Sequence, residues 1–134
     1  MVAFFVLSLL CRQDYEYRKG EGVVDLSSGQ IRTPEELLKV AVAEREAGRP
    51  GPAVAALTFL ATPIPDAAIR ETAQFERAVT YYKSGAYYEA YHDFEGFILK
   101  FPQSERITTA KRMEMTAALD LAKAGKSTWL GLAT

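Results

Sequence analysis

Apolar residues recur at helical spacing over most of the chain after residue 33, and turn residues divide them into segments. The first helix is predicted to start at Thr33, a capping residue whose capping box is completed by Glu36. Gly48 is predicted to end this helix, and a second helix over residues 53 to 61 runs back from it. Two helices joined in this way are typical of a helical hairpin.

The rest of the chain repeats this alternation. A helix over residues 66 to 84, capped by Asp66, is followed by a helix over residues 87 to 100. A fifth helix is predicted from residue 104 to residue 124, with Gly125 ending it. The pattern therefore predicts an all-α chain of antiparallel helical hairpins with no convincing strand.

An internal repeat relates the hairpins. Gly48 and Gly85 lie 37 residues apart, and the same offset places small residues on small ones and large apolar residues on large ones. The aligned pairs are Ala41 with Ala78, Ala53 with Ala90, Leu57 with Phe94, Leu60 with Phe97, and Pro65 with Pro102. Such self-similarity is typical of a repeat array. It predicts a repeat domain over residues 34–125, with units 34–65 and 66–102 and a half unit 104–125.

The second unit resembles a tetratricopeptide repeat, because a small residue, Tyr, Ala, an aromatic residue and Pro follow one another at the expected spacing. These residues are Ala78, Tyr81, Ala90, Phe94 and Pro102. The first unit has Glu44 where the Tyr belongs. The segment from Tyr81 to Glu105 is similar to repeats of bacterial envelope proteins, the outer-membrane-assembly lipoproteins of the BamD type and the Tol-Pal-associated periplasmic proteins.

The resemblance implies a short right-handed solenoid of stacked hairpins. Small residues in its core allow close helix approach, and large ones fill the space between hairpins. The residues that define this core are Ala41, Ala53, Leu57, Ala78, Tyr81, Ala90, Phe94 and Phe97.

Two interpretations stay open for the N-terminus. Residues 1–10 carry no charge and are too few to span a bilayer. With Cys11 they resemble a bacterial lipoprotein signal, which makes Cys11 a candidate for lipid attachment and membrane anchoring. The other interpretation is a short buried helix with an inert Cys11. Residues 12–33 are predicted to be a linker, with Val23 and Val24 as a candidate short strand.

Composition narrows the function. The 134 residues carry a formal charge of -1, which argues against a nucleic-acid partner. One Cys and one His cannot form a zinc site alone, so no metal and no cofactor are predicted. Since no nucleophile and base stand in a recognisable pattern, the chain is predicted not to be an enzyme.

The aromatic residues around the second hairpin exceed what a helical core can hold. Tyr82, Tyr88 and Tyr91 are the candidate surplus, and either partner contact or plain packing would explain them. We therefore expect a protein–protein interaction module or scaffold that binds another protein or peptide. By resemblance its setting is the bacterial periplasm or outer membrane, including outer-membrane protein assembly. The alternatives are a structural segment of a longer repeat protein and a cytoplasmic location.

The fifth helix has an apolar arc of roughly 200°, wider than a one-sided surface helix needs. Its apolar stripe consists of Ile107, Ala110, Ala117, Ala118 and Leu121. Met113 and Ala124 extend the stripe on one side, and Ala122 and Met115 extend it on the other. Residues 126–134 are predicted to be a tail. We expect this tail, a partner or self-association through residues 104–124 to cover the apolar face.

Overall fold

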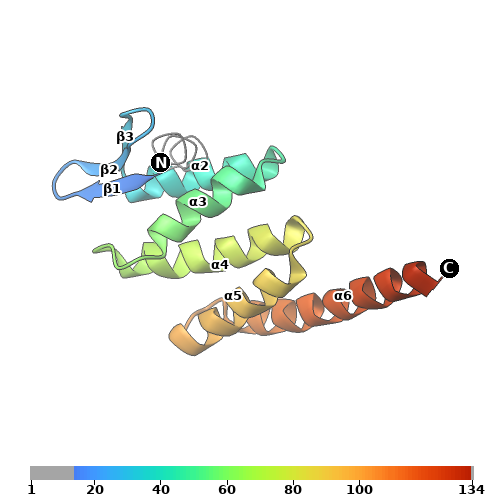
Figure 1. The fold of residues 1–134 in the computed structure, drawn as a ribbon. Helices are drawn as coiled ribbons and strands as arrows, with labels where there is room; N and C mark the ends of the chain where they lie inside the picture. The colour runs from blue at the N-terminus through green and yellow to red at the C-terminus, as the bar shows by residue number, and fades with distance from the viewer. Residues whose placement is uncertain (1–13, 134) are drawn as a thin grey trace, which may run out of the picture. The chain divides into compact units, whose positions relative to one another are not determined.

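The computed structural model describes residues 14–133, with side chains from residue 14 to residue 125 (Figure 1). A small sheet precedes a series of helices, so the predicted helical fold is confirmed, whereas the expectation of an all-α chain without a convincing strand is wrong. The strands are β1 (Tyr15–Arg18), β2 (Gly22–Asp25) and β3 (Ile31–Arg32). The helices are α2 (Pro34–Glu46), α3 (Pro50–Leu60), α4 (Ala67–Lys83), α5 (Tyr87–Lys100) and α6 (Ile107–Ala133). The chain divides into two compact units, residues 1–70 and 71–134.

The antiparallel sheet β1-β2-β3 occupies the segment predicted to be a linker, and that prediction is wrong. The candidate strand at Val23 and Val24 is confirmed as the central strand β2, and both residues are buried. Gly22 opens β2, directly after the turn that joins β2 to β1. Gly22 has a φ of 119°, and a Cβ there would lie 2.5 Å from the carbonyl oxygen of Arg32 on β3. Only glycine allows this close approach.

Helices α2 and α3 form the first hairpin and pack on each other, with α2 also against the sheet. The predicted capping box is confirmed. The Thr33 hydroxyl accepts from the Glu36 N–H at 3.1 Å, and the Thr33 N–H donates to the Glu36 carboxylate at 3.3 Å. The buried apolar residues of the first unit are Val23, Val24, Leu37, Ala41, Ala53, Ala56, Leu57, Leu60, Ile64 and Ile69.

The turns after α2 and α4 have the same hydrogen bonds at the predicted offset. The N–H groups of Gly48 and Arg49 donate to carbonyls three and five residues earlier, at 3.0 and 2.9 Å. Gly85 and Ala86 do the same at 3.1 and 2.9 Å. This pair of bonds is the Schellman motif. The residue directly after the helix has a positive φ in this motif, which favours glycine. The φ values of Gly48 and Gly85 are 82° and 84°.

Helices α4, α5 and α6 enclose the core of the second unit. The Phe75 ring packs in edge-type contacts with the rings of Phe94 and Phe97, with centroid distances of 5.9 and 5.5 Å. The fully or nearly buried residues of this core are Phe75, Ala78, Val79, Ala90, Phe94, Phe97, Ala110 and Ala117. Of the eight residues predicted to define the repeat core, all but Tyr81 are 0% exposed, and Tyr81 is partly buried against the second core.

A largely buried ion pair joins α4 to α5. The Arg77 guanidinium donates to both carboxylate oxygens of Asp93, at 2.7 Å each. Burial alone would lower the pKa of Arg77, but its bonds with Asp93 outweigh this effect and raise the pKa. Buried Gln74 lies beside the pair, where a Cβ at Gly96 would come within 3.0 Å of its amide nitrogen. Gly96 therefore leaves room for Gln74.

Helix α6 is longer than predicted. It runs through Gly125 to Ala133, so the predictions that Gly125 ends it and that a non-helical tail follows are wrong. Glycine inside a helix is only about 1 kcal/mol less favourable than alanine. No proline follows Gly125 to stop the helix. The 27 residues of α6 extend about 40 Å, against about 21 Å for the 14 residues of α5. The end of α6 therefore extends past α5, as Figure 1 shows.

Candidate protein-interaction surface

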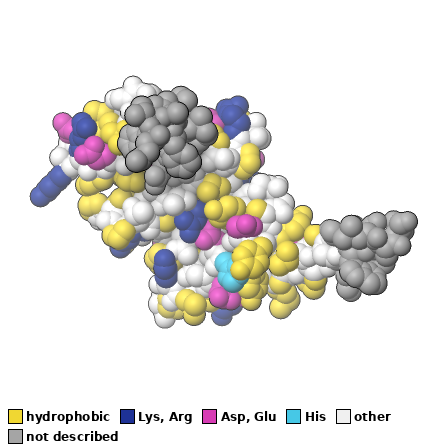
Figure 2. Space-filling view, in the orientation of Figure 1, with side chains coloured by type: hydrophobic (Ala, Val, Ile, Leu, Met, Phe, Trp, Pro, Cys, Tyr) yellow, Lys and Arg dark blue, Asp and Glu magenta, His cyan; other side chains and the backbone are white. Residues whose placement is uncertain are grey.

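The second unit exposes large apolar side chains on α5 and α6. Tyr88 and Leu99 on α5 are 59% and 75% exposed, and Met115 and Leu119 on α6 are 67% and 56% exposed. In Figure 2, hydrophobic side chains lie beside the single His and along α6. Hydrophobic residues gathered on a surface in this way mark interaction sites more often than isolated ones do.

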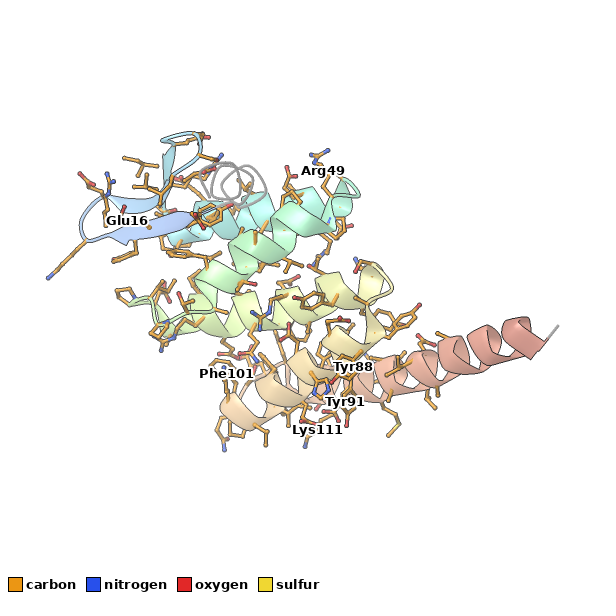
Figure 3. All side chains as sticks on the ribbon, in the orientation of Figure 1. Glu16, Arg49, Tyr88, Tyr91, Phe101 and Lys111 are labelled. Carbon is orange, nitrogen blue, oxygen red and sulfur yellow. The ribbon has the colours of Figure 1, made fainter. Side chains whose placement is uncertain are left out.

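Tyr88 and Tyr91 form an aromatic group with His92 on the outer side of α5 (Figure 3). The His92 ring lies 4.4 Å from the ring of Tyr88 and 5.4 Å from that of Tyr91, both nearly edge-on. Tyr91 also packs partly against the core, whereas Tyr88 is exposed. Of the three tyrosines predicted to meet a partner, Tyr88 is therefore the most accessible.

Tyr82 has a packing role inside the second unit, although the sequence marks it as surplus to the core. Its hydroxyl donates to the carboxylate of Asp120 on α6 at 2.5 Å, and its ring lies 5.5 Å from that of Tyr87. The hydrogen bond with Asp120 raises the pKa of Tyr82, because it stabilises the neutral phenol. Tyr82 therefore ties the end of α4 to α6.

Two carboxylates meet where α5 packs on α6. Partial burial and the charge of Glu95 raise the pKa of Glu114. The charge of Glu95 and a hydrogen bond with it also raise the pKa of Tyr91. The side of α6 that faces α5 is therefore acidic near Glu114.

Leu119, like Leu99 on α5, is an exposed apolar residue that the sequence interpretation missed. It follows Met115 by four residues and therefore lies on the same side of α6. Leu121 was expected in the apolar stripe with Ala110 and Ala117, yet it is 38% exposed. The hairpin of α4 and α5 turns near Gly85, close to the level of Asp120, and residues 121–125 of α6 beyond that level are exposed.

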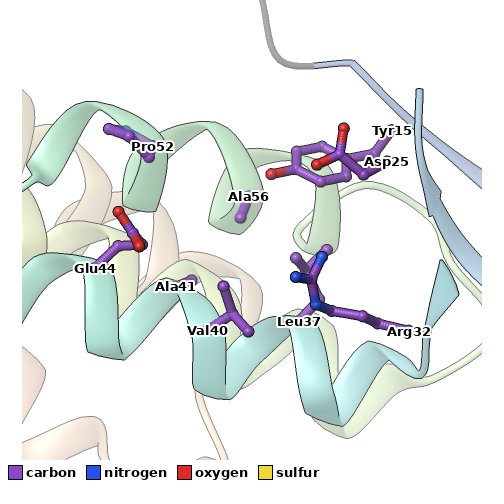
Figure 4. Close-up of a pocket in the computed structure, with 9 residues that line it drawn as sticks. All are labelled: Tyr15, Asp25, Arg32, Leu37, Val40, Ala41, Glu44, Pro52 and Ala56. Carbon is purple, nitrogen blue, oxygen red and sulfur yellow. The ribbon is translucent and has the colours of Figure 1, made fainter. Parts of the chain in front are cut away.

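The first unit contains a pocket of about 200 Å³ between the sheet, α2 and α3 (Figure 4). Its apolar wall is formed by Leu37, Val40, Ala41, Pro52 and Ala56. Hydrogen-bonded neighbours hold its charged side chains. These pairs are Asp25 with Ser27 (2.6 Å), Arg32 with Gln30 (2.7 Å) and Glu44 with Arg49 (2.6 Å).

The tyrosine in this pocket has a perturbed hydroxyl. Burial and the neighbouring Asp25 carboxylate raise the pKa of Tyr15, so its phenol stays protonated. Burial alone would raise the pKa of Asp25, but hydrogen bonds from Ser27 outweigh it and lower the pKa. Because the charged groups already have partners, we do not assign a ligand to the pocket.

Metal binding, membrane crossing and lipid attachment were the remaining questions for the chain. Among the described residues, no three His, Cys, Asp or Glu side chains are grouped to hold a metal ion. No helix in the described part of the chain is long and apolar enough to cross a membrane. Cys11 and the predicted signal segment, residues 1–11, lie outside the described residues.

Comparison with protein-family models finds no family that matches this chain, and comparison with curated proteins and with solved structures finds no match either.

Proposed function

We propose that the chain is a helical-repeat module that binds another protein through the outer surface of α5 and α6, without chemistry of its own. The exposure of Tyr88, Met115 and Leu119 on one unit carries this proposal. Exposed tyrosine offers contact area and a hydroxyl, and leucine and methionine add apolar area that water solvates poorly. These are the properties that a docking protein needs at the centre of an interface.

The repeat hypothesis supports a binding role. Both hairpins turn through the same Schellman motif, and α3 and α5 begin at Pro50 and Tyr87, again 37 residues apart. Ala41 and Ala53 are fully buried, as are their equivalents Ala78 and Ala90. We propose on this basis that the hairpins are tetratricopeptide-like and stack as a right-handed solenoid. Solenoids of this kind present extended surfaces to their partners.

The bacterial envelope is proposed as the setting on the resemblance of the second hairpin alone. The mass of the mature N-terminus tests it, because lipid attachment would add a diacylglycerol to Cys11. An intact, unmodified N-terminus in the source cell would contradict the lipoprotein interpretation. It would leave the interaction surface to be tested separately.

Quantitative affinity capture with surface variants tests the binding function. The full chain, Tyr88→Ala, Leu119→Glu and Leu26→Glu are each used as bait in an extract of the source cell. Leu26 on the first unit is 52% exposed, which makes it a matched control for Leu119. We expect a protein that the full chain and Leu26→Glu retain and the other two variants lose. Equal capture by all four baits would contradict the proposal and favour a structural segment.

A further inference from the structure

The outer face of α6 carries an apolar stripe that the rest of the second unit leaves exposed. Met115, Leu119 and Ala122 are exposed and follow one another at intervals of four and three residues. This spacing places them on one side of a helix. The opposite side carries Ala110 and Ala117, which are fully buried in the core. The stripe is therefore separate from the packing that holds α6 in place.

The charged residues beside this stripe are all basic in the described part of α6. Lys111, Arg112 and Lys123 are exposed. At 100° per residue, Lys111 and Arg112 each lie about 50° from the middle of the stripe, and Lys123 lies about 70° from it. The acidic residues Glu114 and Asp120 lie about 120° away from it. Asp120 accepts a hydrogen bond from Tyr82, and Glu114 is partly buried next to Glu95 on α5. The outer face thus combines apolar and positively charged side chains.

We propose that this face of α6 binds an acidic amphipathic helix of another protein. The proposal rests on the proposed interaction function and names the class of its partner. An apolar stripe on the partner helix would cover Leu119 and its neighbours. Asp and Glu beside that stripe would meet Lys111 on one edge and Arg112 and Lys123 on the other. The basic residues span 13 positions, so a partner helix of about 14 to 18 residues matches the face.

Two other occupants fit the face less well. A second copy of the chain would bring the same basic residues opposite each other, and like charges oppose that pairing. An anionic membrane would attract the basic residues, but helices that lie in membranes usually insert larger apolar faces with aromatic residues. Between residues 107 and 125, where the side chains of α6 are described, the exposed stripe offers only Met115, Leu119 and Ala122 and no aromatic ring. An acidic helix satisfies both the charge and the modest apolar area.

Fluorescence anisotropy with two designed peptides tests the proposal on the full chain. Both peptides are about 18 residues long and carry the same leucine stripe, but one has Glu and the other Lys beside it. We expect the acidic peptide to bind at least about tenfold more tightly than the basic one, with a preference that shrinks as salt is added. Leu119→Glu is expected to weaken binding of the acidic peptide about tenfold, and Leu26→Glu to leave it unchanged.

A charge-reversed variant makes the test specific. The double variant Arg112→Glu, Lys123→Glu should reverse the peptide preference, so that the basic peptide binds more tightly than the acidic one. Circular dichroism of each variant shows that it is folded. The proposal is overturned if the two peptides bind equally well to the full chain, or if the charge reversal leaves the preference unchanged.

Measurements on the rival occupants complete the test. If the chain binds phosphatidylglycerol vesicles, Leu119→Glu abolishes that binding and neither peptide binds, the face is a membrane-binding surface. If sedimentation shows a dimer that Leu119→Glu abolishes, and again neither peptide binds, the occupant of the face is a second copy of this chain. If neither peptide binds but Leu119→Glu still loses the captured cellular protein, the partner class is wrong and the binding function stands. If capture is unaffected as well, both proposals fail.

Discussion

Removing the Arg77 guanidinium should destabilise the second unit strongly. The side chains of Arg77 and Asp93 are 21% and 13% exposed, and two bonds of 2.7 Å join them. Arg77→Ala leaves the Asp93 carboxylate in a largely dry site without its partner. Breaking a fully buried pair in this way costs about 3–5 kcal/mol. Since water still reaches both side chains, we expect a loss of about 2–3 kcal/mol of unfolding free energy.

A double-mutant cycle in urea separates the pair from its surroundings. Arg77→Ala, Asp93→Ala and the double variant are unfolded in urea and followed by circular dichroism. The control cycle uses Arg49 and Glu44, which are also joined by two hydrogen bonds, of 2.6 and 3.2 Å, but are 59% and 28% exposed. We expect a clearly smaller coupling in the control, because water screens it. Equal coupling in the two cycles would refute the argument that burial sets the strength of the buried pair.

Three further predictions concern the second unit. Ala90→Trp should cost about 1–3 kcal/mol, because Ala90 is 0% exposed; an unchanged melting temperature would contradict its buried position. Glu114→Gln should stabilise the chain at pH 7 but not at pH 4. The pKa of Glu114 is raised by burial and Glu95, so the wild type loses stability as the pH rises from about 4.5 through the folded pKa. If Glu114→Gln changes the melting temperature equally at both pH values, this explanation of the pH dependence is disproved. Tyr88→Ala should weaken partner binding more than stability; the reverse result would assign Tyr88 to packing.

The helices could be predicted because their ends depend on local chemistry. The capping box of Thr33 and the positive φ of Gly48 and Gly85 involve residues close together in the chain. The same holds for Asp66, whose carboxylate accepts from the Ile69 N–H at 3.1 Å and starts α4. The buried repeat positions could be predicted from spacing alone.

The sheet and the far end of α6 could not be predicted by the same reasoning. Strands of four, four and two residues are too short for an alternating pattern to stand out. Gly22 acts through its approach to Arg32, a contact that sequence spacing does not reveal. Gly125 looks like the other helix-ending glycines in sequence. Its neighbours favour helix, however, and α6 continues through it.

The candidate surface was predicted in part. The excess of tyrosine indicates that some aromatic rings lie outside the core, and Tyr88 does so. Tyr82 could not be assigned from its own helix, because its partner Asp120 is 38 residues away. The exposure of Leu119 follows from the packing of α6 on α5, which leaves its outer side uncovered.

Photo-crosslinking in the living source cell tests the central claim most directly. A benzophenone amino acid is placed at position 119 on the proposed surface and, as a control, at position 26 on the first unit, where the native leucines are 56% and 52% exposed. We predict a discrete crosslinked product with another protein at position 119 and none at position 26. No product at position 119, or the same products at both positions, would contradict the claim that the outer face of α6 is an interaction surface.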